Sequence, residues 1–170
     1  FDNEEVGSRT MQGADSSFLP GIIRRICLGL GMDEEKTYQA LARSLCISGD
    51  VAHAVHPNHA DKHDPENRPV LGGGPVIKYS AGQKYVTNAV SAAVFEQVCA
   101  AARVPVQKYV NRSDLPGGST IGPALSSMCS ILTVDVGIPI LSMHSVQELG
   151  ALADVEMTAT AFACFYDLDS

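Results

Sequence analysis

Residues 131–141 read ILTVDVGIPIL, a run of apolar and β-branched side chains. Side chains of this kind are typical of strands that lie buried inside a sheet. We predict two strands here, Ile131–Val136 and Ile138–Leu141. A buried sheet is therefore the starting point for placing the other elements of the chain.

A long helix is predicted directly after these strands. Ser145-Val146-Gln147-Glu148 fits a capping box, in which the Ser side chain meets the backbone N–H three residues on and the Glu reaches back. Apolar residues then recur at three- and four-residue spacing: Leu149, Leu152, Val155, Ala159, Phe162 and Tyr166. This spacing predicts an amphipathic helix that covers one face of the sheet.

Towards the N-terminus, helical and extended patterns alternate. Residues 22–30, 34–43 and 120–128 are predicted to be helices. A further helix is predicted to begin at Asn88, which can cap it, and its apolar face is Val90, Val94, Val98 and Ala101. The predicted strands are 75–79, 104–110 and a strand built on the apolar run 44–48, which ends near Asp50. Loops rich in turn-forming residues cover 52–74 and 112–119. The alternation predicts a layered α/β fold with a mostly parallel sheet.

Composition limits the classes of protein that this chain can belong to. With 170 residues, 45% of them hydrophobic, it can form one compact unit but not two domains of ordinary size. A net charge of −7 argues against a nucleic-acid surface. No apolar run approaches the roughly 20 residues of a membrane span, and no signal-peptide pattern opens the chain. Five widely spaced cysteines in apolar surroundings indicate reduced core residues of a cytoplasmic protein.

Candidate metal ligands occur where strands are predicted to end, which is where open α/β sheets bind ligands. Glu4 and Glu5 follow an apparent strand end, Asp50 follows the strand 44–48, and His144 precedes the C-terminal helix. Carboxylates and an imidazole suit Zn²⁺, and also Mn²⁺ or Co²⁺.

The adjacent pair Glu4-Glu5 can divide two roles between its members. Neighbouring side chains on an extended backbone point in opposite directions, so both rarely bind one metal ion. One carboxylate can bind the metal while the other accepts a proton from a metal-bound water, whose pKa falls from about 15.7 to about 7.

Structural explanations of the same residues remain open at this point. An acidic pair is often solvated surface, Asp50 can be a turn residue, and His144 can be a local structural histidine. His53, His56, His59 and His63 can form a flexible metal-binding tract. The glycine-rich segments 72–74 and 117–118 match neither a P-loop nor a dinucleotide fingerprint.

Five segments together carry a resemblance to a known family. They are Asp2-Asn3-Glu4-Glu5-Val6-Gly7-Ser8, then 48–58 (SGDVAHAVHPN), 74–78 (GPVIK), 111–123 (NRSDLPGGSTIGP) and 141–145 (LSMHS). In these segments the sequence resembles the aspartyl aminopeptidases, a family of dinuclear zinc exopeptidases. The matches follow the family's order and cover essentially the whole chain.

The resemblance implies a three-layer α/β/α sandwich of the zinc exopeptidase type, incomplete here, with two Zn²⁺ ions per complete active site. Glu4 would be the general base and Glu5 a ligand of one zinc. Asp50 would bind the other zinc, and His144 would be a further ligand. Mn²⁺ or Co²⁺ would be possible substitutes.

The resemblance also implies how the substrate is recognised. Lys78 would face an acidic side chain at the peptide's N-terminus, since a lone ammonium in a small pocket disfavours apolar residues. Tyr85 would be a neighbour in that pocket, and His53 would lie near the substrate and stabilise charge on the scissile carbonyl. His56 fits either the pocket or, as we prefer, support of the Asp50 loop.

The sequence departs from the family pattern upstream of Asp2. The family supplies a His and a metal-bridging Asp from that region, and also an inserted dimerisation domain. Since the chain opens at Phe1 without an initiator Met, we expect residues 1–170 to be the C-terminal portion of the catalytic domain. The parent protein would form a large tetrahedral homo-oligomer, while the isolated chain would bind zinc weakly and not hydrolyse peptides.

Two other functions are compatible with the sequence. A metallohydrolase with the same site could act on different substrates, as an acylamino deacylase or a neutral aminopeptidase does. A non-catalytic assembly or cargo scaffold could use the same fold without chemistry.

Overall fold

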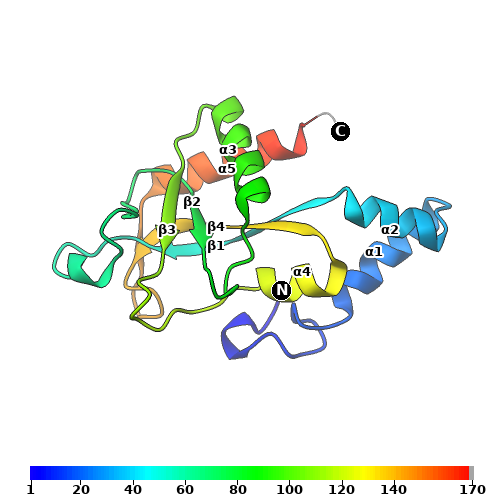
Figure 1. Cartoon of the computed structure of the whole chain (residues 1–170), viewed down its shortest axis with the longest axis horizontal. Helices are drawn as coiled ribbons and strands as arrows, with labels where there is room; N and C mark the ends of the chain where they lie inside the picture. The colour runs from blue at the N-terminus through cyan, green and yellow to red at the C-terminus, as the bar shows by residue number, and fades with distance from the viewer. Residues whose placement is uncertain (169–170) are drawn as a thin grey trace.

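The computed structural model describes residues 1–168, which form a five-stranded sheet with helices on both faces (Figure 1). The strands are β1 (Leu45–His53), β2 (Val76–Tyr79), β3 (Gln107–Val110), β4 (Leu132–Leu141) and β5 (Leu149–Gly150). Their order is β1-β4-β2-β3, with β5 pairing with β4. β1 pairs with β4, and β2 with β3, in parallel, whereas β2 and β5 run antiparallel to β4. The predicted α/β class is confirmed, with a mixed sheet in which most of the paired length is parallel.

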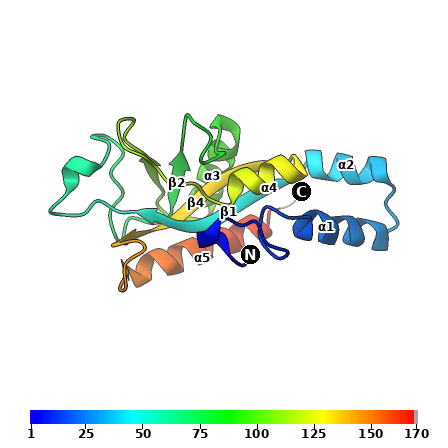
Figure 2. The ribbon, with the colours of Figure 1, turned by 90° about the horizontal axis from the view of Figure 1, so that it is seen from below.

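Helices form layers on either side of this sheet. They are α1 (Phe18–Gly29), α2 (Glu34–Ala42), α3 (Ala89–Ala102), α4 (Gly122–Cys129) and α5 (Leu152–Tyr166), with short 3-10 turns η1 (Glu4–Val6) and η2 (Ala60–Lys62). α3 and α5 pack together on one face, and α4 packs on the other (Figures 1 and 2). α1 and α2 form a hairpin beyond the end of the sheet (Figure 2). Among residues 1–168, no helix has the length and apolar character needed to cross a membrane.

The main core lies between the sheet and the α3/α5 layer. Side chains alternate along each strand, so Val134 and Val136 of β4 and Ile77 of β2 point to this layer. There they pack against Phe95 of α3 and Ala161 of α5, all without exposed surface. The five cysteines are free thiols, three of them buried, as their apolar surroundings predict.

β4 is one continuous strand where we predicted two. The predicted break at Gly137 does not exist, because this glycine pairs with Asp50 of β1 and Val76 of β2. A Cβ at position 137 would lie 2.6 Å from the backbone of Val51. The glycine therefore permits close strand contact and does not end the strand.

Helix α3 begins as predicted but buries a different face. The Asn88 side chain accepts hydrogen bonds from the N–H groups of Val90 and Ser91, which completes a capping box. The buried side chains are Ser91, Ala92, Phe95, Val98 and Cys99, whereas Val90 is 62% exposed. Of the four residues predicted to form the buried face, only Val98 is buried. The reason is that this helix is apolar almost all round, so the spacing of apolar residues does not single out one side.

The capping box predicted at Ser145 is wrong. α5 begins at Leu152, because Leu149 and Gly150 pair with the end of β4 as strand β5. The Ser145 hydroxyl donates to the carbonyl of Gln147 instead of capping a helix. Glu148 does reach back, but its carboxylate accepts from the N–H of His144 at 2.7 Å.

Candidate functional site

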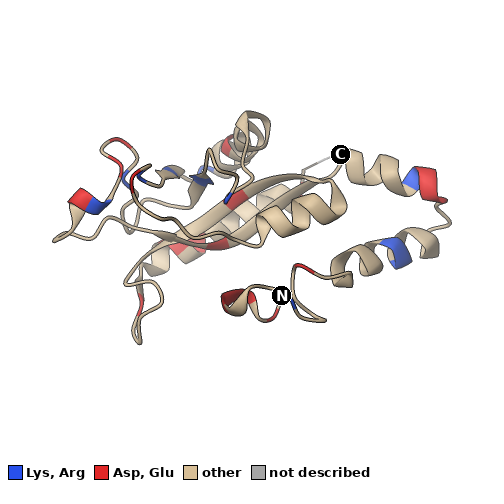
Figure 3. Ribbon diagram, turned by 60° about the horizontal axis from the view of Figure 1, so that its bottom comes forward, with Lys and Arg blue, Asp and Glu red and all other residues tan. Residues whose placement is uncertain are grey.

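A cavity of about 510 Å³ lies on the face of the sheet opposite α3 and α5. Its lining includes Glu4, Glu5, Asp50, His53, Lys78, Tyr85 and His144, together with Tyr109, Ser119, Thr120, Met143 and Glu148. All the predicted site residues except His56 therefore meet in one place, although they come from segments far apart in the sequence. Figure 3 shows the acidic turn η1 near the N-terminus, which forms one side of the cavity.

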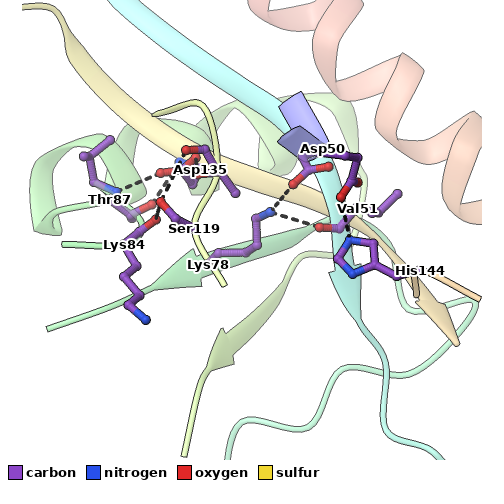
Figure 4. A network of polar contacts seen from close by, with 11 residues as sticks. Asp50, Val51, Lys78, Lys84, Thr87, Ser119, Asp135 and His144 are labelled. Atoms are coloured by element: carbon purple, nitrogen blue, oxygen red, sulfur yellow. Dashed lines mark hydrogen bonds and ion pairs between the residues drawn. The ribbon is translucent and has the colours of Figure 1, made fainter. Parts of the chain in front are cut away.

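Lys78 and Asp50 form an ion pair in the floor of the cavity (Figure 4). Lys78 is 2% exposed, and its Nζ donates to Asp50 Oδ2 and to the carbonyl of Val51, both at 2.9 Å. β4 runs between the strands that carry the pair, and its Gly137 has no side chain that could separate them. Nζ also lies 5.2 Å from the ring centroid of Tyr85, a cation–π distance.

Asp50 lies inside β1, not after its end. We predicted a strand over the apolar run 44–48 that ends near Asp50, but the pairing with β4 continues to His53. The apolar run stops at Ser48, and pairing with a long central strand extends β1 beyond it. Asp50 projects from the sheet face into the cavity, where it contacts Lys78.

His144 and Glu5 approach each other at the cavity rim. His144 Nε2 lies 3.2 Å from Glu5 Oε2, and both side chains are largely exposed. His144 has a φ of 66°, a left-handed conformation that is uncommon without glycine. The carboxylate of Glu148, which accepts from its N–H, holds the backbone at this point.

Glu4 and Glu5 lie in the 3-10 turn η1, so the extended backbone that we predicted for them is wrong. Left-handed conformations at Asn3 and Gly7 bound the turn. Three residues complete one 3-10 turn, so neighbouring side chains still point in different directions. Burial raises the pKa of Glu4, and the charges of Asp50 and Glu5 raise it further, while Lys78 and His144 lower it.

The remaining predicted residues divide between two hollows. His53 lines the main cavity, and burial, followed by the charge of His63, lowers its pKa. Burial raises the pKa of Tyr85 to about 12, so its hydroxyl stays protonated at neutral pH. His56 faces a neighbouring hollow of about 390 Å³ beside His59, their ring centroids 5.2 Å apart.

The donors in the cavity fit zinc in kind but do not complete a site. Glu5 and His144 offer a carboxylate and an imidazole, which Zn²⁺ binds well. Asp50 Oδ2 already pairs with Lys78. Among residues 1–168, no three His, Cys, Asp or Glu side chains lie close enough to hold one metal ion. This part of the chain can supply some ligands of a four-coordinate zinc, not all of them.

Asp135 is a residue of this region that we did not select from the sequence. It lies on β4 with no exposed surface and binds two segments that form the cavity walls (Figure 4). An acidic residue within a run of buried β-branched side chains was the available signal, because buried charges require partners.

Comparison with known sequences adds an independent observation. A sequence model of the family described as "Aminopeptidase I zinc metalloprotease (M18)" matches residues 1–166. The "Probable M18 family aminopeptidase 2" of Clostridium acetobutylicum is 53% identical over 99% of this chain and 39% of its own length. "Aspartyl aminopeptidase 4" of Saccharomyces cerevisiae is 46% identical over 98% of this chain and 36% of its own length. The chain thus spans less than two fifths of these relatives.

Solved structures share the fold. A chain in the cryo-EM structure of the Ape4 and Nbr1 complex has a TM-score of 0.93 and 42% identity, covering 96% of this chain and 31% of its own. The structure of the S. cerevisiae mApe1 dodecamer has a TM-score of 0.85 and 28% identity, covering 98% of this chain and 36% of its own. The resemblance therefore extends from sequence motifs to the arrangement of the whole sheet.

Proposed function

The chain belongs to the M18 family of zinc metallopeptidases, and we propose that the whole protein removes Asp or Glu from the N-terminus of peptides. The observation that carries this proposal is the floor of the cavity. A buried ammonium lies beside the carboxylates and imidazole that suit a zinc site. A substrate held there would present its N-terminal side chain to a cation.

Glu4 is the proposed general base. Zinc, when bound, would supply Lewis acidity and lower the pKa of a water molecule to about 7. Glu5, Asp50 and His144 are the residues that would hold the metal ions, two per complete site. Glu4 takes the water's proton and passes it to the leaving amine. Its raised pKa makes it a stronger base than an unperturbed glutamate.

Lys78 is the proposed determinant of acidic specificity. An ammonium has three N–H donors, and two of them bind Asp50 and the Val51 carbonyl. The third can bind a substrate carboxylate, with Tyr85 closing the pocket beside it. A substrate with Leu at its N-terminus would leave this donor of Lys78 without a partner, which costs about 1–3 kcal/mol of binding free energy. His53 would stabilise charge on the scissile carbonyl, and His56 would support the loop after β1.

The whole protein is proposed to be a cytoplasmic homo-oligomer, in a tetrahedral arrangement, of which this chain is the C-terminal portion of the catalytic domain. The dodecamer of the similar yeast structure supports oligomerisation. The isolated chain is proposed to be inactive, because its described residues do not gather three metal ligands. Turnover of peptides by the pure 170-residue chain would contradict that proposal.

The test measures zinc-dependent release of Asp and of Leu from matched dipeptides by the full-length protein. We expect Asp to be released preferentially and Glu4→Gln to reduce the rate about 10²–10⁴-fold, the range of general acid–base catalysis. Lys78→Leu should reverse the preference, while Lys36→Leu, an exposed lysine of α2 outside the cavity lining, should not.

The outcomes separate the alternatives. If Leu is released in preference to Asp by the unmodified protein, the metal chemistry stands and the Lys78 pocket is wrong. If no dipeptide is cleaved with zinc restored, and Glu4→Gln leaves every function unchanged, the protein is a scaffold and not an enzyme.

A further inference from the structure

Asp135 connects two segments of the chain that are distant in sequence. Its Oδ2 accepts from the N–H of Val86 at 2.7 Å, and its Oδ1 accepts from the hydroxyl of Thr120 at 2.7 Å. Its own N–H donates to the hydroxyl of Thr87 at 2.9 Å. Hydrogen bonds to a carboxylate are about twice as strong as neutral ones. One buried side chain therefore fixes both segments to the centre of the sheet.

These two segments are adjacent parts of the cavity wall. Tyr85, next to Val86, lines the cavity from one segment, and Gly118, Ser119 and Thr120 line it from the other. The segments also touch directly, because Lys84 Nζ donates to the Gly117 carbonyl at 2.6 Å and Ser119 Oγ donates to the Lys84 carbonyl at 3.1 Å. Those contacts are exposed to water, whereas Asp135 is fully buried.

The start of α4 is shaped to accept the Asp135 side chain. A Cβ added at Gly122 would lie 2.4 Å from Asp135 Oδ1. Only a residue without a side chain fits there while the carboxylate keeps its present position. The carboxylate is thus enclosed by three elements: β4, the segment before α3 and the N-terminal end of α4.

We propose that Asp135 is a positioning residue that holds these two adjacent wall segments in place, and through them supports the binding of the substrate's N-terminal residue. Asp135 acts through Val86 and Thr120 and does not touch the substrate. The part that concerns substrate rests on the proposed function. The part that concerns the walls rests on the hydrogen bonds alone.

The test compares three threonine variants of the full-length protein. Thr120→Val removes one donor to Asp135 at nearly constant volume, and Thr120→Ser keeps the hydroxyl. Thr133→Val is the control, because Thr133 is buried, lies on the same face of β4 as Asp135 and donates to the Ile131 carbonyl, away from the cavity. Two quantities are measured: the kinetics of an Asp-initiated dipeptide, and amide hydrogen exchange over residues 84–88.

We expect Thr120→Val to raise KM about tenfold with kcat within about twofold, as a lost bond to a charged group in a binding wall should. Exchange over 84–88 should also accelerate, because Asp135 is shared with Val86. Thr120→Ser should restore both quantities, and Thr133→Val should change neither. Asp135→Asn should reproduce both changes.

Three results discriminate further. If KM rises but exchange over 84–88 does not, Thr120 contacts substrate itself and the inference is overturned. If Thr133→Val raises KM equally, the effect is general loosening and the inference is also overturned. If exchange responds as expected in a protein that cleaves no acidic dipeptide, Asp135 holds the walls and the proposed function fails.

Discussion

The two faces of the sheet are built by the same strands but differ in their role: one packs against α3 and α5, and the other forms the floor of the cavity. Ile77 and Lys78 are neighbours on β2 and almost equally buried, yet one packs against α3 and the other faces the cavity. Asp135 stands between Val134 and Val136 in the same way. Since side chains alternate, one strand can stabilise the fold on one face and carry chemistry on the other.

The difference shows what a buried polar face requires. The strand side chains Val134, Val136 and Ile77 on the α3/α5 face need only close packing, whereas the buried polar strand residues on the cavity face need partners to offset their lost hydration. Lys78 has Asp50 and the Val51 carbonyl, and Asp135 has Val86 and Thr120.

The strongest way to break the comparison is Phe95→Ala on the α3/α5 face. Phe95 has no exposed surface and contacts Phe162 edge to face, with ring centroids 6.5 Å apart. Its truncation should lower the free energy of unfolding by about 3–5 kcal/mol. Urea denaturation of the full-length protein measures this change. The ratio of Asp to Leu release by the folded fraction should stay constant, and a changed ratio would mean that the faces are coupled.

Asp154→Asn sharpens the comparison, because Asp154 is a buried carboxylate on the helix of the apolar face. It accepts from the N–H groups of Gly72 and Gly74 at 2.7 and 2.8 Å. An amide nitrogen there cannot accept, so the free energy of unfolding should fall by about 1–3 kcal/mol. Thermal or urea unfolding should show this loss, and Glu156→Gln, exposed on the same helix, should be close to neutral. An equal effect of both variants would contradict the assigned role.

The smallest expected effect concerns pH and the cavity side. Burial lowers the pKa of His63, as does the charge of Arg68, and its ring lies near Tyr109. Below about pH 6.5 His63 is protonated in the unfolded chain but still neutral in the folded chain. The free energy of unfolding therefore falls as the pH falls towards the lowered pKa of His63. His63→Gln should lose less stability between pH 7.5 and 5.5 than the unmodified protein, measured by urea denaturation. His59→Gln, an exposed histidine of the same loop, is the control; an unchanged pH dependence in His63→Gln would refute the assignment.

Elements with local signals could be predicted from the sequence, and elements set by pairing could not. The Asn88 cap and the helical spacing around Ile26 led to α3 and α1. The extension of β1 past Ser48 and the continuity of β4 through Gly137 depend on each strand's neighbour. The wrong prediction of a capping box at Ser145 has the same cause. Leu149 pairs with Leu141 in the sheet, so residues expected at the start of the helix are part of strand β5.

The sequence predicted which residues line the site better than it predicted how those residues contact one another. Motifs selected the residues that meet in the cavity, but they did not indicate that Asp50 binds Lys78, since that contact crosses an intervening strand. Asp135 was overlooked because its importance comes from Val86 and Thr120, which are distant in sequence. Motifs identify groups that touch a substrate better than groups that act through others.

The parallel pairing of β1 with β4 has a consequence for how the chain reaches its fold. Leu45 pairs with Leu132, so the two longest strands meet only after most of the chain has been synthesised. Closing such a loop costs entropy before any contact repays it, and contacts of this range slow folding. On a ribosome, β1 would wait for β4 while the segment between them is synthesised, and partly folded chains with exposed strand edges are prone to aggregate. Assembly of the cavity should therefore be among the last events of folding.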